Sequence, residues 1–173
     1  FKRREVYAST GPRITLRFFA GYDFGAADLK AKDLAANGYR KGVPMGGDLP
    51  MAAKGAKAPS FLVAAMKDAQ GGNLDRIQIV KGWTDADNKE HEKIYNVAWS
   101  DMKVRKLGKD GKVPAVGNTV DVATATWKDT IGAAELTGQW SDPDFNPSQR
   151  AYYYVRAIEI PTPRWTAYDA LRF

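Results

Sequence analysis

The sequence contains no cysteine and a single histidine, and these two scarcities exclude several kinds of chemistry. Without cysteine there are no disulfides, no thiolate metal sites and no cysteine nucleophiles. His91 alone provides neither an imidazole cluster for a metal nor the usual catalytic triad, so only carboxylate metal sites remain. Metal-dependent hydrolysis by this chain alone is therefore not expected, and no cofactor is predicted within it.

Long apolar runs are also missing. No run approaches the roughly 18 residues that cross a bilayer, so no membrane span is expected. The first residues, Phe1-Lys2-Arg3-Arg4, are not followed by the apolar segment of a signal peptide. Because the chain does not begin with Met, we expect it to be a fragment of a larger protein. Its 173 residues, 44% of them hydrophobic, suit a single domain with an ordinary core.

The net charge of +6 and the isoelectric point near 9.4 permit attraction to nucleic acid, anionic lipid or an acidic partner. The basic residues are spread along the chain, however, and acidic residues lie between them. This distribution favours a solvated surface, and no nucleic-acid partner is predicted. Nonspecific nucleic-acid binding, the alternative, would depend steeply on salt.

Short runs of β-branched and aromatic residues, separated by turn signals, indicate strands. The predicted strands are Ile14 to Phe19, Phe61 to Lys67, Leu74 to Trp83, Ile94 to Ser100, Val120 to Trp127, Ala133 to Trp140 and Arg150 to Ile160. Gly71-Gly72-Asn73 predicts a hairpin between the second and third, and Lys103 to Gly117 reads as a mobile hairpin tip. The pattern predicts a mostly β fold, an antiparallel β-sandwich, with immunoglobulin-like topology preferred and a jelly roll as the alternative.

The run Arg150 to Ile160 is predicted to be a central strand around which the others are arranged. Every second residue from Ala151 to Ala157 is expected to face inward, because side chains alternate along a strand. The apolar positions change face at Ile158 and Ile160, which indicates a bulge or a buried far end. Pro161 and Pro163 then end the ladder, since proline has no N–H to donate.

Residues 20–59 are rich in alanine and glycine and are predicted to form a long excursion from the sandwich. Ala26 to Ala36 suits a short helix with Asn37-Gly38 as its stop signal. Gly38 to Leu49 is a glycine-rich loop, in which backbone N–H groups near Arg40 and Lys41 can hold an anion. The spacing matches no phosphate-binding fingerprint, so packing of a flexible loop is the favoured alternative.

Two acidic segments and one aromatic pair are candidate ligand sites. Asp142, Asp144 and Asn146 have the spacing that opens a calcium loop, but Pro147 replaces the required glycine, so a turn with side-chain hydrogen bonds is favoured. The acidic residues before His91 suit a solvated turn better than a metal site. Most aromatic residues are expected in the core, and Tyr152 and Tyr154 are the best candidates for an exposed stacking platform.

Four segments carry a family resemblance. They are Arg4-Glu5-Val6-Tyr7-Ala8-Ser9-Thr10-Gly11-Pro12-Arg13-Ile14, Gly42-Val43-Pro44-Met45-Gly46-Gly47-Asp48-Leu49, Leu74-Asp75-Arg76-Ile77-Gln78-Ile79-Val80-Lys81-Gly82-Trp83, and Tyr153-Val155 through Glu159-Ile160-Pro161-Thr162-Pro163-Arg164-Trp165. Together they resemble the domain of unknown function 3604 family of bacterial proteins over much of the chain.

The resemblance implies a partner for this chain, an upstream catalytic domain of the same protein. Members of that family look like proteins with a PHP-type metallohydrolase domain upstream, which would hold the divalent metal. Residues 1–173 would then be an accessory β-sandwich, with 1–13 as its junction to the catalytic domain. The chain lacks the histidine set of such a domain and stops before the segment expected to return to it. The resemblance therefore implies a non-catalytic part of a metal-dependent hydrolase, a phosphoesterase by preference.

Under this interpretation the chain shapes the cleft of the upstream domain. Arg13, Arg40 and Lys41 are the candidates for neutralising a substrate anion. The candidates for contact with the upstream domain are Tyr7, Thr10, Tyr39, Arg164 and Trp165. The alternative hypothesis is a free-standing β-sandwich that binds carbohydrate or another ligand, because a sandwich fold alone does not decide function. A flat apolar patch near the chain ends favours the first hypothesis, and an aromatic shelf away from them favours the second.

Overall fold

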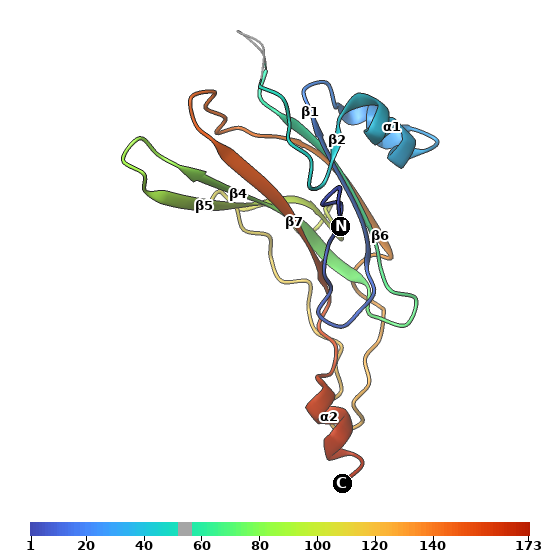
Figure 1. Ribbon diagram of the computed structural model, residues 1–173. Helices are drawn as coiled ribbons and strands as arrows, with labels where there is room; N and C mark the ends of the chain where they lie inside the picture. Colours follow the sequence, from blue (N-terminus) through green and yellow to red (C-terminus); the bar gives the residue numbers. More distant parts are fainter. Residues whose placement is uncertain (52–56) are drawn as a thin grey trace.

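The computed structural model describes residues 1–51 and 57–173, which form two antiparallel sheets packed as a β-sandwich (Figure 1). The four-stranded sheet has the order β2-β1-β3-β6, with bounds Val43–Pro44, Thr15–Gly21, Ser60–Met66 and Glu135–Ser141. The three-stranded sheet has the order β5-β4-β7, with bounds Glu90–Trp99, Leu74–Thr84 and Ala151–Glu159. The predicted mostly β fold and antiparallel sandwich are confirmed.

The main core lies between the two sheets and follows from strand alternation. Leu16 and Phe18 of β1 point inward together with Phe61 of β3, and they meet Ile77 and Ile79 of β4. The rings of Phe18 and Phe61 stack with centroids 5.5 Å apart. Burying each such side chain contributes roughly 1.5–3 kcal/mol. These aliphatic and aromatic contacts hold the two sheets together.

A second, smaller core covers the outer face of the four-stranded sheet. Phe19, Phe24 and Leu62 are buried there beneath a 3-10 helix, η1 (Ala26–Lys30), and the helix α1 (Leu34–Lys41). Asp33 caps α1 by accepting a hydrogen bond from the Ala36 N–H, at 2.9 Å. Because one face of β1 and β3 meets the other sheet and the opposite face meets these helices, the second half of β1 and most of β3 are buried on both sides.

Gly38 lets α1 approach β1 closely, which makes its replacement a test of this packing. A Cβ at Gly38 would come within 2.6 Å of the Phe19 ring. We expect Gly38→Ala to lower the free energy of unfolding by about 1–3 kcal/mol, despite alanine's better helix propensity, because the core has no room for the methyl group. Denaturant unfolding measures this. Gly25→Ala is the control, since nothing lies within 4 Å of its Cβ position, and an equal loss in both variants would contradict the packing argument.

The predicted excursion is only partly correct. The predicted helix Ala26–Ala36 is divided between η1 and α1, and Asn37-Gly38 does not end it, because α1 continues to Lys41. The predicted loop Gly38–Leu49 therefore contributes the last turn of α1 and the short strand β2, which pairs with Phe19 and Ala20 of β1. The part of the excursion at residues 52–56 lies outside the described residues.

The predicted hairpin between β3 and β4 is wrong, because these strands belong to different sheets. The turn residues are present, but the segment between the strands crosses from one sheet to the other. β3 pairs with β1 and β6, whereas β4 pairs with β5 and β7. A turn signal shows that the chain reverses and does not show which neighbour each strand then pairs with.

One further strand prediction is wrong. Val120–Trp127 forms no strand, only an isolated bridge between Asp121 and Thr126. Its alternating Val and Thr residues imitate a strand, but Val122 is 72% exposed and gains no packing. The Lys103–Gly117 segment is not a strand hairpin either. It is anchored to the sandwich by the buried side chain of Arg105.

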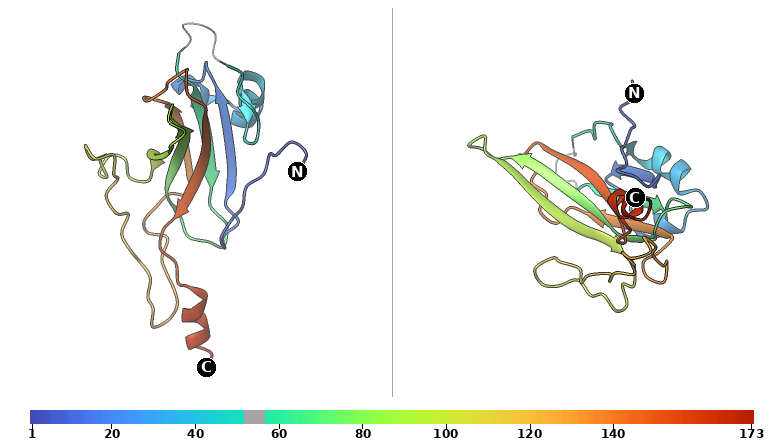
Figure 2. Two further views of the ribbon diagram at one scale, coloured as in Figure 1. Left: turned by 60° about the vertical axis from the view of Figure 1, so that its left-hand side comes forward. Right: turned by 90° about the horizontal axis from the view of Figure 1, so that it is seen from below.

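β7 is an edge strand and not the predicted central one. It pairs with β4 alone and forms one side of the three-stranded sheet, as Figures 1 and 2 show. The predicted inward face is correct, since Tyr153, Val155 and Ala157 pack against the core. After β7 the chain leaves the sheet through Pro161 and Pro163 and ends in a short helix, α2 (Trp165–Ala170), which projects from the sandwich (Figure 1).

Candidate functional site

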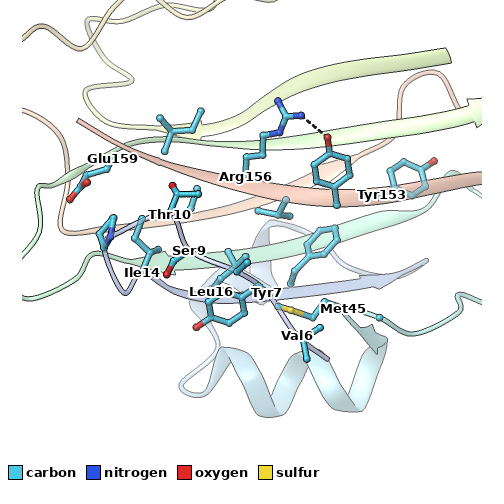
Figure 3. Close-up of a pocket in the computed structure, with 18 of the residues that line it drawn as sticks. Val6, Tyr7, Ser9, Thr10, Ile14, Leu16, Met45, Tyr153, Arg156 and Glu159 are labelled. Atoms are coloured by element: carbon cyan, nitrogen blue, oxygen red, sulfur yellow. Dashed lines mark hydrogen bonds between the residues drawn. The ribbon is translucent and has the colours of Figure 1, made fainter. Parts of the chain in front are cut away.

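A large hollow lies between the N-terminal segment and β7 (Figure 3). We call this space of about 860 Å³ the β7 hollow. Residues 4–12, here called the strap, form its outer wall, while β1, Met45 and β7 form the others. Its apolar lining includes Val6, Ile14, Leu16, Phe18, Met45, Val155 and Ala157, and its polar lining includes Arg4, Ser9, Thr10, Arg156, Glu159 and Thr162.

The hollow exists because the sandwich is open on this side. β2 pairs with β1 only at Phe19 and Ala20, so the first half of β1 has a strand neighbour on one side alone. β7 likewise has a neighbour on one side. Val155 and Ala157 consequently stay half-buried, whereas Ile77 and Ile79 at equivalent inward positions of β4 are fully buried.

The strap is held at its two ends. At the first, the Tyr39 hydroxyl donates a hydrogen bond to Glu5, and the Arg4 guanidinium lies 3.0 Å from the Asp48 carboxylate. Gly46, with φ of +80°, lets the strap approach, because a Cβ there would overlap the Arg4 carbonyl group. At the other end, the N–H of Arg13, just after the strap, donates to the Asp68 carboxylate at 2.7 Å. The sequence revealed neither the role of Gly46 nor the Tyr39–Glu5 contact.

Three of the five predicted interface residues lie near the strap. Tyr7 and Thr10 line the β7 hollow, and Tyr7 and Tyr39 both line a smaller adjoining pocket of about 260 Å³. Arg164 and Trp165 lie elsewhere, at the start of α2, and Trp165 is 73% exposed. The structure thus divides the predicted residues between two surfaces. Their role as a domain interface stays a prediction.

The structure does not bring the three predicted anion-binding residues together as a set. Arg13 precedes the first residue of β1, while Arg40 and Lys41 end the helix that packs on the far half of that strand. The Lys41 ammonium lies 2.7 Å from Asp28, and the Arg40 guanidinium donates to the Asn37 side chain at 2.6 Å. Both side chains have partners within the chain, so this geometry gives the predicted role no added support.

The Asp28–Lys41 pair makes the free energy of unfolding depend on pH. The hydrogen bond from Lys41, followed by those from Asn37 and the Gly25 N–H, lowers the pKa of Asp28 to about 2. Because the folded-state pKa is below the ordinary value, the pair stabilises the fold above about pH 4, and this contribution is lost as the pH falls through 2. We expect Asp28→Asn to lower the melting temperature at pH 7, with the difference from wild type vanishing near pH 2.

Thermal unfolding between pH 2 and 7 measures this dependence, and Asp48→Asn is the matched control. Asp48 also pairs with an arginine, but its side chain is 88% exposed, so its replacement is expected to change little at any pH. If the melting temperature of Asp28→Asn is below that of wild type by the same amount at pH 2 and pH 7, ionisation of Asp28 does not stabilise the fold.

A buried polar network includes Asp142, the first residue of the segment that has calcium-loop spacing. The Lys81 ammonium lies 2.6 Å from Asp142, and both side chains are almost fully buried. The Tyr153 hydroxyl donates to the same carboxylate at 2.6 Å, and burial followed by this bond raises the pKa of Tyr153. The Asp144 N–H bonds back to Asp142 at 2.9 Å, as the favoured turn interpretation predicted. The network therefore joins the Asp142 loop to β4 and β7.

The second acidic segment has a similarly local role. The His91 imidazole lies 2.6 Å from the Asp85 carboxylate and stacks on Trp83, with ring centroids 5.2 Å apart. The hydrogen bond from His91 is the main cause of the lowered pKa of Asp85. Among residues 1–51 and 57–173, no group of three or more histidine, aspartate or glutamate side chains is placed to hold a metal ion.

The lining of the β7 hollow is mostly apolar and also includes the guanidinium of Arg156 and the carboxylate of Glu159. Burial raises the pKa of Glu159, but this carboxylate accepts a hydrogen bond from the Gly72 N–H and helps hold the turn before β4. Arg156 donates to the Tyr154 hydroxyl at 2.5 Å, the contact drawn in Figure 3.

No helix among the described residues is long and apolar enough to cross a membrane. Comparison with curated proteins and with solved structures found no match. Comparison with protein families gave one finding, the family described as "Protein of unknown function (DUF3604)", matched over residues 1–173. The match extends from the strap through both sheets to α2, and the chain belongs to the DUF3604 family.

Proposed function

We propose that this chain is a non-catalytic β-sandwich that packs against the catalytic domain of a PHP-like metal-dependent hydrolase, a phosphoesterase by preference. In this proposal the metal is held by the upstream domain, and the chain shapes the cleft. We further propose that the sandwich has immunoglobulin-like topology, as the strand pattern suggests, and that the protein is bacterial, as the family resemblance implies.

The observation that carries the proposal is the exposure of large apolar side chains at both end segments. Val6 and Tyr7 of the strap are about half exposed, and Trp165 and Leu171 at α2 are 73% and 55% exposed. α2 has six residues, none of them buried. A helix this short is marginal in water without tertiary contacts, so its apolar side chains indicate a missing packing partner.

The described residues also support a non-catalytic role. Their acidic side chains include no metal-binding group, and Asp28, Asp75 and Asp142 are paired with basic side chains inside the chain. We expect residues 1–173 to show no turnover of p-nitrophenyl phosphate in the presence of Mg²⁺, Mn²⁺ or Zn²⁺. Metal-dependent turnover that copurifies with the chain would overturn the proposal.

A pair of measurements tests the packing role of α2. In the isolated chain, Trp165→Ala with Leu171→Ala should change the free energy of unfolding by less than about 0.5 kcal/mol, because both side chains are exposed. In the full-length protein, the same variant should lower thermal stability and turnover together. An unchanged full-length protein would contradict the role of α2.

Arg40→Ala in the full-length protein tests the predicted anion contact. Arg40 is replaced and Lys41 is kept, because replacement of Lys41 would also remove the pair with Asp28.

One observation favours the alternative of a ligand-binding module. Tyr152 and Tyr154 lie on the outer face of β7, with nearly parallel rings 6.4 Å apart. Tyr152 is 61% exposed beside Gly82. Retardation of the chain in gels that contain soluble polysaccharides, abolished by Tyr152→Ala, would favour this alternative over the accessory role.

A further inference from the structure

We propose that two copies of this chain associate through the free edge of β7, which pairs antiparallel with β7 of the second copy. A two-fold axis passes between the two Val155 residues. The two three-stranded sheets then form one continuous sheet with the order β5-β4-β7 in each half. Such a two-fold contact uses the same surface on both copies and closes after two subunits.

The edge of β7 is long and carries few of the features that discourage pairing. β7 has nine residues, and within the described part of the chain it pairs with β4 alone. Natural edge strands are usually short or carry proline, lysine or a bulge that discourages pairing. Between Ala151 and Glu159 there is no proline, glycine or lysine, and the charged residues are Arg156 and Glu159. The strand therefore keeps the backbone geometry that accepts another strand.

The direction of the backbone groups follows from one hydrogen bond. The Ile160 N–H donates to the Asn73 carbonyl, just before β4, at 2.8 Å. Backbone groups of successive residues point to opposite sides of a strand. Arg156 and Tyr154 therefore bond toward β4, while the N–H and C=O of Val155 point to the free edge. Tyr153 and Ala157 share this outward direction.

The sequence of β7 is complementary to itself when Val155 lies opposite Val155. In that register Tyr154 faces Arg156 of the second copy, Tyr152 faces Ile158, and Tyr153 faces Ala157. No like charges oppose one another. Within one chain the Arg156 guanidinium already lies 5.3 Å from the centre of the Tyr154 ring, so the same cation–π contact is available across the axis. Such cross-strand pairs stabilise sheets.

The β7 hollow provides space at this edge. Its lining includes β7 from Tyr153 to Glu159, and the strap forms the opposite wall. None of the hydrogen bonds of the described residues joins the strap to β7. A second strand can therefore pair with β7 without breaking a hydrogen bond between the strap and β7.

A second copy suits this edge better than an unrelated peptide, because β7's own sequence supplies the complementary side chains. The proposal is independent of the accessory role, since it involves neither α2 nor any upstream domain. Failure of one therefore leaves the other standing.

Sedimentation of residues 1–173 over a concentration series tests the proposal. The expected mass rises from 19.1 kDa toward twice that value. An edge contact of this length is smaller than the roughly 1,200 Å² typical of stable complexes, so the series should extend to about 200 µM. A chain that stays monomeric throughout overturns the proposal.

Two variants at Tyr154 identify the surface. Tyr154→Arg places arginine opposite Arg156 of the second copy at two symmetric positions, and we expect the dimer dissociation constant to rise about tenfold. Tyr154→Glu places a carboxylate there and should keep or tighten the dimer. Within one chain the Tyr154 hydroxyl has charged neighbours of both signs, Arg156 at 2.5 Å and Glu92 at 3.5 Å. Denaturant unfolding of each monomer therefore accompanies the sedimentation series, so that a change in intrachain stability is told apart from a change in dimer affinity.

Val155→Pro tests the backbone directly. Proline removes the N–H that points to the free edge and leaves the N–H groups that bond to β4. A large loss of dimer with a retained folded monomer supports the proposal. If this variant fails to fold, the Tyr154 pair decides. A dimer equally strong in Tyr154→Arg and Tyr154→Glu would place the interface elsewhere and overturn the proposal.

Discussion

Replacement of Lys81 by methionine is expected to lower the free energy of unfolding by about 3–5 kcal/mol, because it leaves a buried carboxylate without its cation. The Lys81 and Asp142 side chains are 3% and 0% exposed, and their charged atoms lie 2.6 Å apart. Lys81 also donates to the Asp144 carbonyl at 2.7 Å. Denaturant unfolding of the isolated chain measures the loss.

The chain contains a matched control for Lys81. The Lys93 ammonium lies 2.5 Å from the Asp144 carboxylate in the same region, but both side chains are about half exposed. Lys93→Met should therefore cost less than about 1 kcal/mol. Lys81→Met combined with Asp142→Leu should cost less than Lys81→Met alone, because the second change removes the stranded charge. Equal losses in Lys81→Met and Lys93→Met would show that burial does not set the strength of these pairs.

Arg105→Met is expected to have the second large effect, about 1.5–3 kcal/mol, because Asp75 keeps its pair with Arg76 at 2.7 Å but loses the buried, charge-assisted hydrogen bond from Arg105. The Arg105 guanidinium lies 2.5 Å from the Asp75 carboxylate, and both side chains are 7% exposed. It also donates to the Ser100 hydroxyl at 2.9 Å and to the Pro114 carbonyl at 2.8 Å. One side chain thus fastens the segment after β5 to the start of β4.

The readout for Arg105 combines unfolding with limited proteolysis. Arg105→Met should expose residues 106–116 to proteases under conditions in which the two sheets stay folded. Arg105→Lys keeps the charge but loses the planar set of donors, so an intermediate loss is expected. Lys112→Met is the control, because its pair with Asp110 is exposed and spans 3.8 Å. Unchanged proteolysis of Arg105→Met would show that other contacts fasten the segment.

The strands that the sequence predicted correctly are those in which alternation and β-branched content agree. Six predicted runs overlap strands β1, β3, β4, β5, β6 and β7. Alternation also predicted the inward face of β7. Sheet membership was not predictable, because it depends on pairing between distant segments. The β7–β4 pairing joins residues 68 to 85 positions apart, and no local pattern reports such a contact.

The buried ion pairs were missed because a charged side chain in a sequence is normally read as exposed. One signal was available for Lys81. It shares the parity of Ile77, Ile79 and Trp83 in a strongly apolar strand, so alternation places its charge on the inward face. An inward lysine requires a buried acid, and Asp142 next to the end of β6 was a candidate. Arg105 lies in irregular chain, where no periodicity exists to reveal burial.

The order of strands along the chain has a consequence for synthesis on the ribosome. The β4–β5 hairpin is local and can form early, whereas the other side of β4 receives its partner only when β7 emerges, near the end of the described chain. Until then the apolar inward face of β4 lacks both β7 and the Asp142 loop. We expect nascent chains that end before about residue 150 to expose this surface and to depend on chaperones, because long-range pairing is slow.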